Sequence, residues 1–216
     1  MTTKTYDRQT AKLLAVIGEN MPELSGDVMQ GWIENPKSVQ KVLKEAFCPP
    51  EATPKFEIWK TIKLGTGLKT ADDFRKAIKN GGMKISNWAD DILGKSGFTV
   101  ITGETEVDLI KVTVAELGFK EGARRDQIYE RAKELGLELC PPEVGPQLRM
   151  QYRDQPNGEW ILIGMEPIRD SDGVLFVFDV VRSGSGLWLY GHYDYPGCVW
   201  HADGQWVFVR SRKYQK

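Results

Sequence analysis

The chain has 216 residues, of which 41% are hydrophobic and 27% are charged, and its formal net charge is −1. This composition excludes a chain that is disordered throughout, and it provides no overall attraction to nucleic acid or to an anionic membrane. The N-terminal apolar run LLAVIG is too short for a secretion signal or a membrane span. Cys48, Cys140 and Cys198 are widely separated, which is typical of a reducing compartment, so we expect a soluble cytoplasmic protein.

The first fifty residues predict helices. Leu14 and Ile17 recur at helical spacing, and Ser25 has the chemistry of a helix cap. Pro36, directly after an asparagine, predicts the first turn of a further helix. That helix should stop at residues 48–50, because two consecutive prolines cannot donate helical hydrogen bonds. We therefore predict a helical subdomain over residues 1–50.

The middle of the chain, residues 55–152, predicts mixed helices and strands. Residues 55–64 are rich in β-branched and aromatic side chains, as strands are. Thr70 and Asp73 have the spacing of a capping box at the start of a helix. Further along we expect a helix capped by Ser86, a strand over 107–114, an amphipathic helix over 124–135 and a short helix over 146–152.

From residue 158 to 212 the hydrophobic period changes to that of strands. The segments EWILIGMEPI, GVLFVFDVV, GLWLYGHYDY and QWVFVRSR are separated by Asp-Gly and Ser-Gly-Ser-Gly turns. An antiparallel sheet of about four strands is predicted here. The fold class is therefore α+β, with residues 55–216 forming one α+β domain after the helical subdomain.

Several phrases of the sequence occur together in other proteins. They are FEIWKTIKLGTGLKTADDFRKAIK, ISNWADDILGK, IYERAKELGLELCPPEVGPQLRMQY and DQPNGEWILIGMEPIRDSDG. Over roughly residues 55–180 the chain resembles a recurring set of uncharacterised bacterial proteins. The resemblance implies a bacterial origin and a shared fold, and it carries over no catalytic residue.

Two loops have the composition of ligand sites but not the spacing. KLGTGLKT departs from the glycine and lysine pattern of phosphate loops, and Asp72 and Asp73 follow it, so we predict a simple turn between a strand and a helix. RDSDGV, residues 169–174, lacks the remaining ligands of a calcium loop. We predict that it is a hairpin turn.

A helix-turn-helix is one alternative for residues 124–152, and it would make the protein nucleic-acid-associated. Arg124 and Arg149 could then reach phosphates. Across residues 118–156, however, seven basic side chains are balanced by seven acidic ones. A balanced face gains little affinity from counterion release. We favour two packed helices and keep nucleic-acid binding as the first alternative function.

The stretch HYDYPGCVWHADGQW, residues 192–206, contains both histidines of the chain. Cys198 and His201 have a spacing found in metal sites, and His192 or Asp194 could complete such a site. Cysteine with histidine could also form a nucleophilic pair. A hydrolase or metalloenzyme centred on His192, Cys198 and His201 is the second alternative, although one such pair is a weak signal. No catalytic residue, metal ligand or cofactor is predicted.

The preferred hypothesis depends on the alternation in GLWLYGHYDY. Strand geometry puts Trp188, Tyr190 and His192 on one face and the leucines on the other. The leucine face should meet the core. The face with the aromatic side chains is then free to form a contact surface, and aromatic residues are common anchors of protein interfaces. Whether this stretch is surface or core stays open. We predict a non-catalytic binding or regulatory module that contacts a protein partner, with no membrane partner, through Trp188, Tyr190, His192, Tyr193 and Trp200.

Overall fold

The computed structural model describes residues 8–47, 56–195 and 197–210. The chain divides into two compact units, Met1–Pro54 and Lys55–Lys216. Within the described ranges, no helix is both long enough and apolar enough to cross a membrane.

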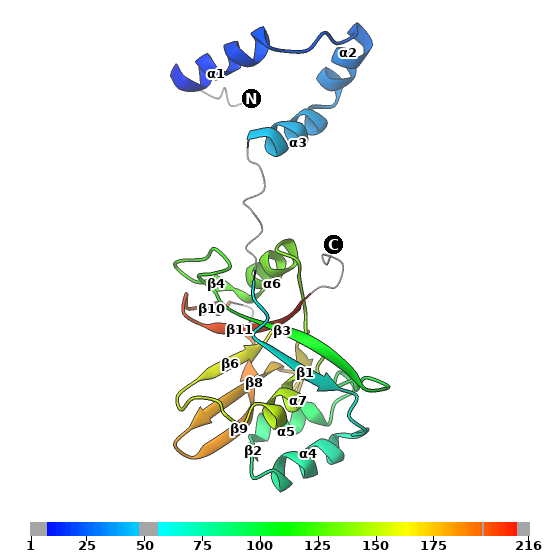
Figure 1. Cartoon of the computed structure of the whole chain (residues 1–216), viewed down its shortest axis with the longest axis vertical. Coiled ribbons are helices and arrows are strands. Elements are labelled where there is room, and N and C mark those ends of the chain that lie inside the picture. Colours follow the sequence, from blue (N-terminus) through cyan, green and yellow to red (C-terminus); the bar gives the residue numbers. More distant parts are fainter. Residues whose placement is uncertain (1–7, 48–55, 196, 211–216) are drawn as a thin grey trace. The chain divides into compact units, whose positions relative to one another are not determined.

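The N-terminal unit consists of α1 (Arg8–Glu19), α2 (Gly26–Glu34) and α3 (Pro36–Phe47) (Figure 1). Ser25 caps α2, as predicted, by accepting a hydrogen bond from the Val28 amide at 3.4 Å. The predicted stop at residues 48–50 lies outside the described residues. Among the side chains described in this unit none is buried, and Ile33 is 72% exposed. The hydrophobic core therefore belongs to the second unit.

The second unit alternates short helices and strands. Its helices are α4 (Ala71–Asn80), α5 (Asn87–Leu93), α6 (Arg125–Glu134) and α7 (Val144–Gln151). Its strands are β1 (Lys60–Leu64), β2 (Lys84–Ile85), β3 (Thr105–Thr113), β4 (Ala123–Arg124), β5 (Leu137–Glu138), β6 (Trp160–Ile163), β7 (Ile168–Arg169), β8 (Leu175–Ser183), β9 (Gly186–Tyr193), β10 (Val199–Trp200) and β11 (Gln205–Arg210).

Local signals in the sequence placed several element boundaries correctly. Thr70 and Asp73 form the predicted capping box of α4, and Ser86 caps α5. The predicted hairpin turn over residues 169–174 joins β7 to β8, and the Asp170 carboxylate accepts the amide hydrogens of Asp172 and Val174. Each of these is a contact between residues close in sequence, which is why the sequence predicts it.

The fold class is α+β, as predicted. The predicted C-terminal sheet of about four strands is smaller than the sheet that the structure contains. Within the described residues, one nine-stranded sheet runs in the order β1-β3-β11-β6-β8-β9-β2, with β5 and β7 pairing beside this path. The sheet is also mixed, because β11 pairs with β6, and β2 with β9, in parallel. A separate pair joins β4 to β10.

The hydrophobic content of β11 explains why the two predicted sheet regions merge. Trp206, Val207 and Phe208 are consecutive and fully buried, so both faces of this strand need cover. The strand therefore lies inside the sheet, between β3 of the middle segment and β6 of the C-terminal segment. Its central position joins residues 55–152 and 158–212 into one sheet.

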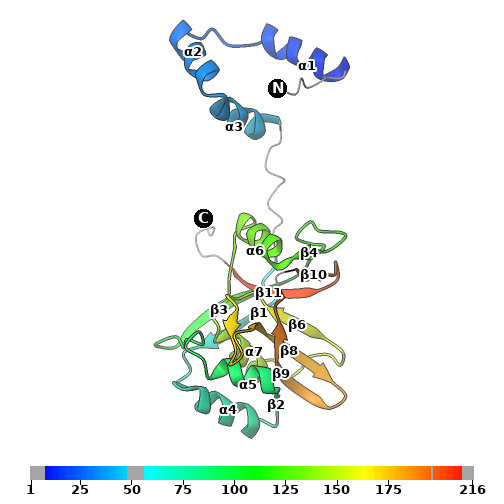
Figure 2. The same cartoon turned by 180° about the vertical axis from the view of Figure 1, so that it is seen from behind.

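Helices pack on both faces of the sheet (Figures 1 and 2). On one face, Tyr129 of α6 meets the rings of Trp206 and Phe208 edge-on, with centroids 5.7 and 6.0 Å apart. On the other face, Gly145 of α7 lies against Phe178, and Gly191 of β9 lies against α5. The cavity described below lies on the same face of the sheet as α6, but over β8 and β9.

Close packing inside this unit can be tested at glycine. A methyl group at Gly164 would overlap the Phe208 ring, whereas nothing lies within 4 Å of the corresponding position at Gly184. We expect Gly164→Ala to lower the free energy of unfolding by ~1–3 kcal/mol, since overpacking a dense core forces rotamer and backbone shifts. Urea denaturation should show a much smaller effect for the control Gly184→Ala. Equal losses for both variants would show that the segment around Gly164 is loosely packed.

Candidate functional site

Strand β9 pairs with β8 along its whole length, and this register sets the candidate site. Val181 lies opposite Trp188, Asp179 opposite Tyr190, and Val177 opposite His192. Residues directly opposite in an antiparallel pair share a face. Leu189 points to the other face and is fully buried, so β9 divides as its alternation predicts.

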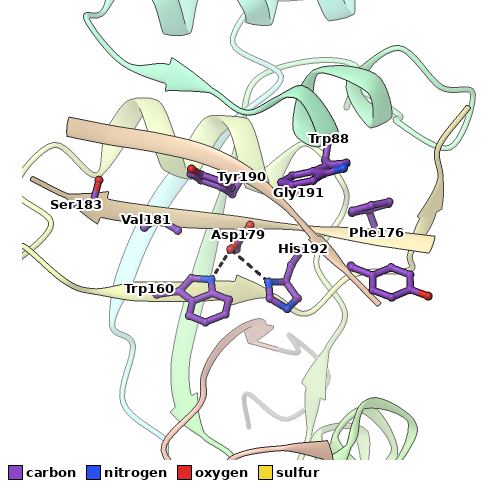
Figure 3. Close-up of a pocket in the computed structure, with 10 residues that line it drawn as sticks. Trp88, Trp160, Phe176, Asp179, Val181, Ser183, Tyr190, Gly191 and His192 are labelled. Carbon is purple, nitrogen blue, oxygen red and sulfur yellow. Dashed lines mark hydrogen bonds and ion pairs between the residues drawn. The ribbon is translucent and has the colours of Figure 1, made fainter. Parts of the chain in front are cut away.

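A cavity of about 600 Å³ lies on this face of the sheet (Figure 3). Trp160 of β6, Asp179 of β8, and Tyr190 and His192 of β9 line it over the sheet. The lining continues at the end of the strand pair, where it includes Trp88 of α5, Phe176 and Tyr193. Its volume falls in the range of ~300–1,000 Å³ found for small-molecule sites.

Asp179 is the buried polar group of this cavity. The residue is only 2% exposed, and its Oδ2 accepts a hydrogen bond from the Trp160 indole N–H. Its other oxygen, Oδ1, has no hydrogen-bond partner among the described residues. Burial raises the pKa of the Asp179 carboxyl to about 8, because desolvation disfavours the charged form. The carboxyl is therefore mostly protonated at neutral pH.

His192 lies beside this carboxyl and between two indole rings. Its Nδ1 is 3.9 Å from Oδ2 of Asp179, and its ring centroid is 4.8 Å from both Trp160 and Trp200. Burial lowers the pKa of His192, so the imidazole is neutral at neutral pH. An acid with a raised pKa next to a base with a lowered one, both on the wall of a cavity, makes this a candidate functional site.

The five residues predicted for binding divide into three groups. Tyr190, His192 and Tyr193 line the cavity. Trp188 lies at its margin, where its ring packs 5.3 Å from Tyr190. Trp200 is 7% exposed and lies behind His192, with its ring edge-on to the buried Trp206.

Sequence reasoning missed Trp88, Trp160, Phe176 and Asp179. Trp88 and Trp160 come from distant segments, so the pattern of one strand could not reveal them. Asp179 had a signal of its own, because it is the single charged residue in the run VLFVFDVV. A carboxylate in such a run is costly unless the site uses it.

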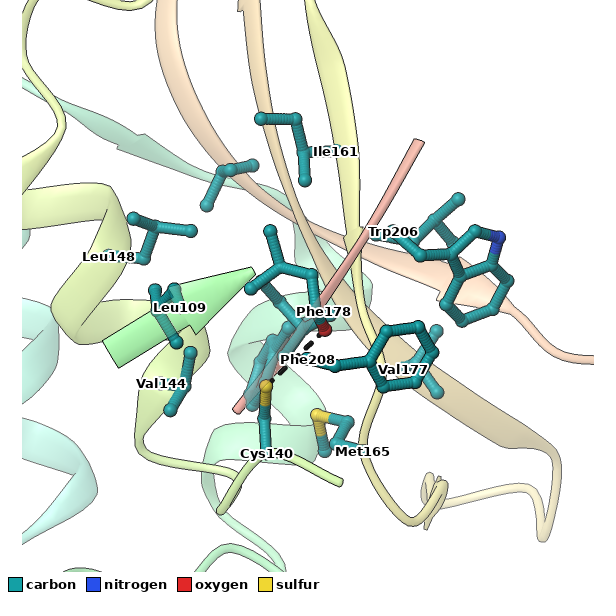
Figure 4. Close-up of a cluster of buried hydrophobic side chains, with 14 of the residues drawn as sticks. Leu109, Cys140, Val144, Leu148, Ile161, Met165, Val177, Phe178, Trp206 and Phe208 are labelled. Carbon is teal, nitrogen blue, oxygen red and sulfur yellow. Dashed lines mark hydrogen bonds between the residues drawn. The ribbon is translucent and has the colours of Figure 1, made fainter. Parts of the chain in front are cut away.

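Core side chains cover the opposite side of the same strands and also part of the side that carries Asp179. Figure 4 shows Phe178 and Ile161 among the packed side chains there. Phe178 and Ile161 are fully buried, and the thiol of Cys140 lies 3.4 Å from the Val207 carbonyl oxygen. Asp179 is therefore polar on a strand whose neighbouring positions are core.

The structure does not unite His192, Cys198 and His201. Cys198 and His201 line a second cavity of about 470 Å³, and His192 is not part of that lining. The buried carboxylate of Asp194 forms an ion pair with Arg125 of α6 instead. Among the described residues, no three His, Cys, Asp or Glu side chains form a group that could hold a metal ion.

The arginines of the nucleic-acid alternative have partners inside the protein. Arg124 pairs with Asp126 at 3.1 Å. Arg149 is fully buried, and its guanidinium donates to Gln155 and to the carbonyl oxygen of Tyr152. A buried guanidinium cannot reach a phosphate backbone, so Arg149 cannot make the predicted contact, and of the two arginines only Arg124 is exposed.

The glycine loop at residues 65–67 is held by a carboxylate from α7's N-terminal end. Glu143, fully buried, accepts hydrogen bonds from the amides of Gly65 and Ile101 at 2.8 Å each. Gln147 donates to the Thr66 hydroxyl at 2.7 Å. The Gly65 amide, which a phosphate would need, is already bonded, in agreement with the predicted turn.

In comparisons with protein-family models, curated proteins and solved structures, nothing matches the chain. We therefore infer the function of the protein from the geometry of the cavity.

The division of β9 into two faces predicts unequal costs of truncation. Leu189→Ala removes a fully buried side chain, and such cavities cost ~2–5 kcal/mol. Trp188→Ser and Tyr190→Ser each remove a half-buried ring and should lower the melting temperature less. Thermal melts of the three variants compare the costs directly. If the serine variants lose as much stability as Leu189→Ala, the rings belong to the core.

The raised pKa of Asp179 predicts a pH-dependent stability. Above its ordinary value of 3.8 the unfolded chain releases this proton, while the folded protein keeps it up to about pH 8. Stability from this group therefore falls as pH rises between about 4 and 8. Asp179→Asn cannot ionise, so its stability relative to wild type should rise over that window by up to several kcal/mol.

Denaturant melts at several pH values measure this difference. Asp154→Asn controls for loss of a surface carboxylate, since that side chain is 83% exposed. A difference between Asp179→Asn and wild type that stays constant from pH 4 to 8 would contradict the raised pKa.

Proposed function

We propose that the unit Lys55–Lys216 is a binding module that holds a small organic molecule in the cavity over β6, β8 and β9. The observation that carries this proposal is a ring-lined cavity of about 600 Å³ with one buried carboxyl on its wall. Small-molecule sites combine mostly apolar walls with a few placed polar groups, and this cavity has that composition.

The exposed rings around the cavity support the proposal. Trp88 is 54% exposed, Trp160 44% and Tyr193 51%. Exposed apolar side chains are ordinary when scattered, but rings gathered around one concave site indicate a contact surface. A flat ligand between these rings would bury apolar area and stack on their faces.

Binding fits the arrangement better than catalysis. The distance of 3.9 Å between His192 and Asp179 is longer than a hydrogen bond. Ser183, which also lines the cavity, is hydrogen-bonded to Ser185 at 2.8 Å rather than to the imidazole. Cys198 and His201, the other residues of the hydrolase hypothesis, line the other cavity. These contacts support a site that recognises a ligand without transforming it.

The protein partner expected from the sequence stays a prediction, and so do the cytoplasmic location and bacterial origin. Unpaired Cys140 and Cys198 are consistent with a reducing compartment. The predicted protein interface and the proposed small-molecule site lie on the same face of the sheet. In the proposal the rings contact a small molecule in the cavity instead of a protein surface.

Titration with indole tests the proposed function. In nitrogen-15 spectra, indole should shift the side-chain N–H signals of Trp88 and Trp160, with a dissociation constant on the order of 1 mM. Tyr190→Ser should weaken binding by about threefold to tenfold, because one ring contact contributes about 0.5–1.5 kcal/mol. Tyr195→Ser is the matched control, since Tyr195 is exposed and is not part of the cavity lining. Equal weakening in both variants, or no shift of the two tryptophan signals, would contradict the proposal.

A further inference from the structure

The described lining of the cavity contains a carboxyl group and aromatic rings but no permanently positive side chain. Its described lining includes Asp179 and no lysine or arginine. Lys84 is nearby in the fold, but its ammonium group lies 5.1 Å from the ring of Trp188, at the cavity margin. Electrostatics therefore disfavour an anionic ligand and leave neutral and cationic ligands.

The hydrogen bonding of Asp179 is incomplete. Oδ2 has the Trp160 indole as donor, while Oδ1 is buried and has no partner in the described part of the chain. The carboxyl lines the cavity, so a positive charge held there would be attracted to its ionised form and, where it carries an N–H group, would also donate a strong hydrogen bond to it.

The rings around this carboxyl favour the same charge. The face of an aromatic ring is negative, so Trp, Tyr and Phe attract cations placed over them. Trp160, Tyr190, Phe176, Tyr193 and Trp88 all line the cavity with Asp179. A buried carboxyl near several aromatic rings can attract an ammonium group through its charge and through the ring faces.

We propose that the ligand of this cavity is a small organic cation, an alkylammonium that keeps its charge at neutral pH, whose positive nitrogen lies beside Asp179 and the rings of Trp160 and Tyr190. The inference rests on the proposed function of the cavity, and it adds the ligand's charge.

The protonation of Asp179 links such binding to pH. Without the cation, burial raises the pKa of this carboxyl to about 8, and an adjacent positive charge would lower it again. Binding at pH 7 therefore releases a proton, and affinity should rise with pH until about 8 and then level off. The groups that face Asp179 are Trp160 from β6 and Tyr190 and His192 from β9. Protonation of His192 at low pH would oppose the cation further.

Three probes that share a benzyl or phenyl group test the charge. Benzyltrimethylammonium keeps its charge at every pH, benzyl alcohol is neutral, and benzoate is an anion. We expect the cation to bind at least about tenfold more tightly than benzyl alcohol at pH 9, and this preference to shrink toward pH 6. Benzoate should bind most weakly. The signals of Trp88 and Trp160 report whether each probe occupies this cavity.

Variants assign the preference to the carboxyl. Asp179→Asn should reduce the ratio of cation to alcohol affinity to about threefold or less, while Asp154→Asn should keep it. If Asp179→Asn does not fold, the pH profile of the wild-type protein tests the same point.

Trimethyllysine carries the trimethylammonium group of this probe on a protein side chain, so a peptide that contains it tests whether the ligand belongs to a protein. Tighter binding of that peptide than of benzyltrimethylammonium would support the cation chemistry and identify a protein side chain as its source.

The outcomes separate this inference from the proposed function. If benzyl alcohol or benzoate binds in the cavity as tightly as the cation, the charge assignment is wrong and the binding proposal stands. An affinity for the cation that does not change between pH 6 and pH 9 would also overturn the assignment. If no probe shifts the Trp88 and Trp160 signals at ~10 mM, both proposals fail.

Discussion

The pairing of β8 with β9 decides which side chains meet above the sheet. Asp179 lies opposite Tyr190, and Val177 lies opposite His192, so the carboxyl, the phenol and the imidazole share one face. On its other edge, β8 pairs with β6, whose Trp160 bonds the same carboxyl. A slip of one residue would turn Asp179 toward the core side, where Phe178 and Val180 are fully buried. The candidate site exists only in this register.

Keeping a carboxyl at this position costs stability. Asp179 is nearly inaccessible, and one of its oxygens has no hydrogen-bond partner among the described residues. An apolar residue of similar size would avoid the desolvation of a carboxyl that ionises above about pH 8. The buried carboxylate of Glu143, in contrast, accepts hydrogen bonds from two backbone amides. Other buried side-chain atoms of the described residues also have no partner, but among them only Asp179 Oδ1 belongs to a residue that lines this cavity.

How much the sequence could predict depends on the range of each contact. The caps at Ser25, Thr70 and Ser86 and the turn at Asp170 involve near neighbours, and the sequence identified all of them. The two faces of β9 also followed from alternation around Leu189. The extent of the sheet did not, because β11 pairs with β3 and with β6 across long stretches of chain. For the same reason Trp160 and Trp88 were missed, and Cys198 and His201 were grouped with His192 although they line another cavity.

The central claim is that Asp179 is a buried carboxyl held in its neutral form at the wall of a ligand cavity. Carbon-13 spectra of the side-chain carboxyl groups, recorded from about pH 3 to pH 10, measure this state directly, and the signal missing from Asp179→Asn identifies the residue. The account predicts that this signal titrates with a midpoint of about 8. A midpoint near the ordinary value of 3.8 would contradict it, because the carboxyl would then be solvated and charged at neutral pH.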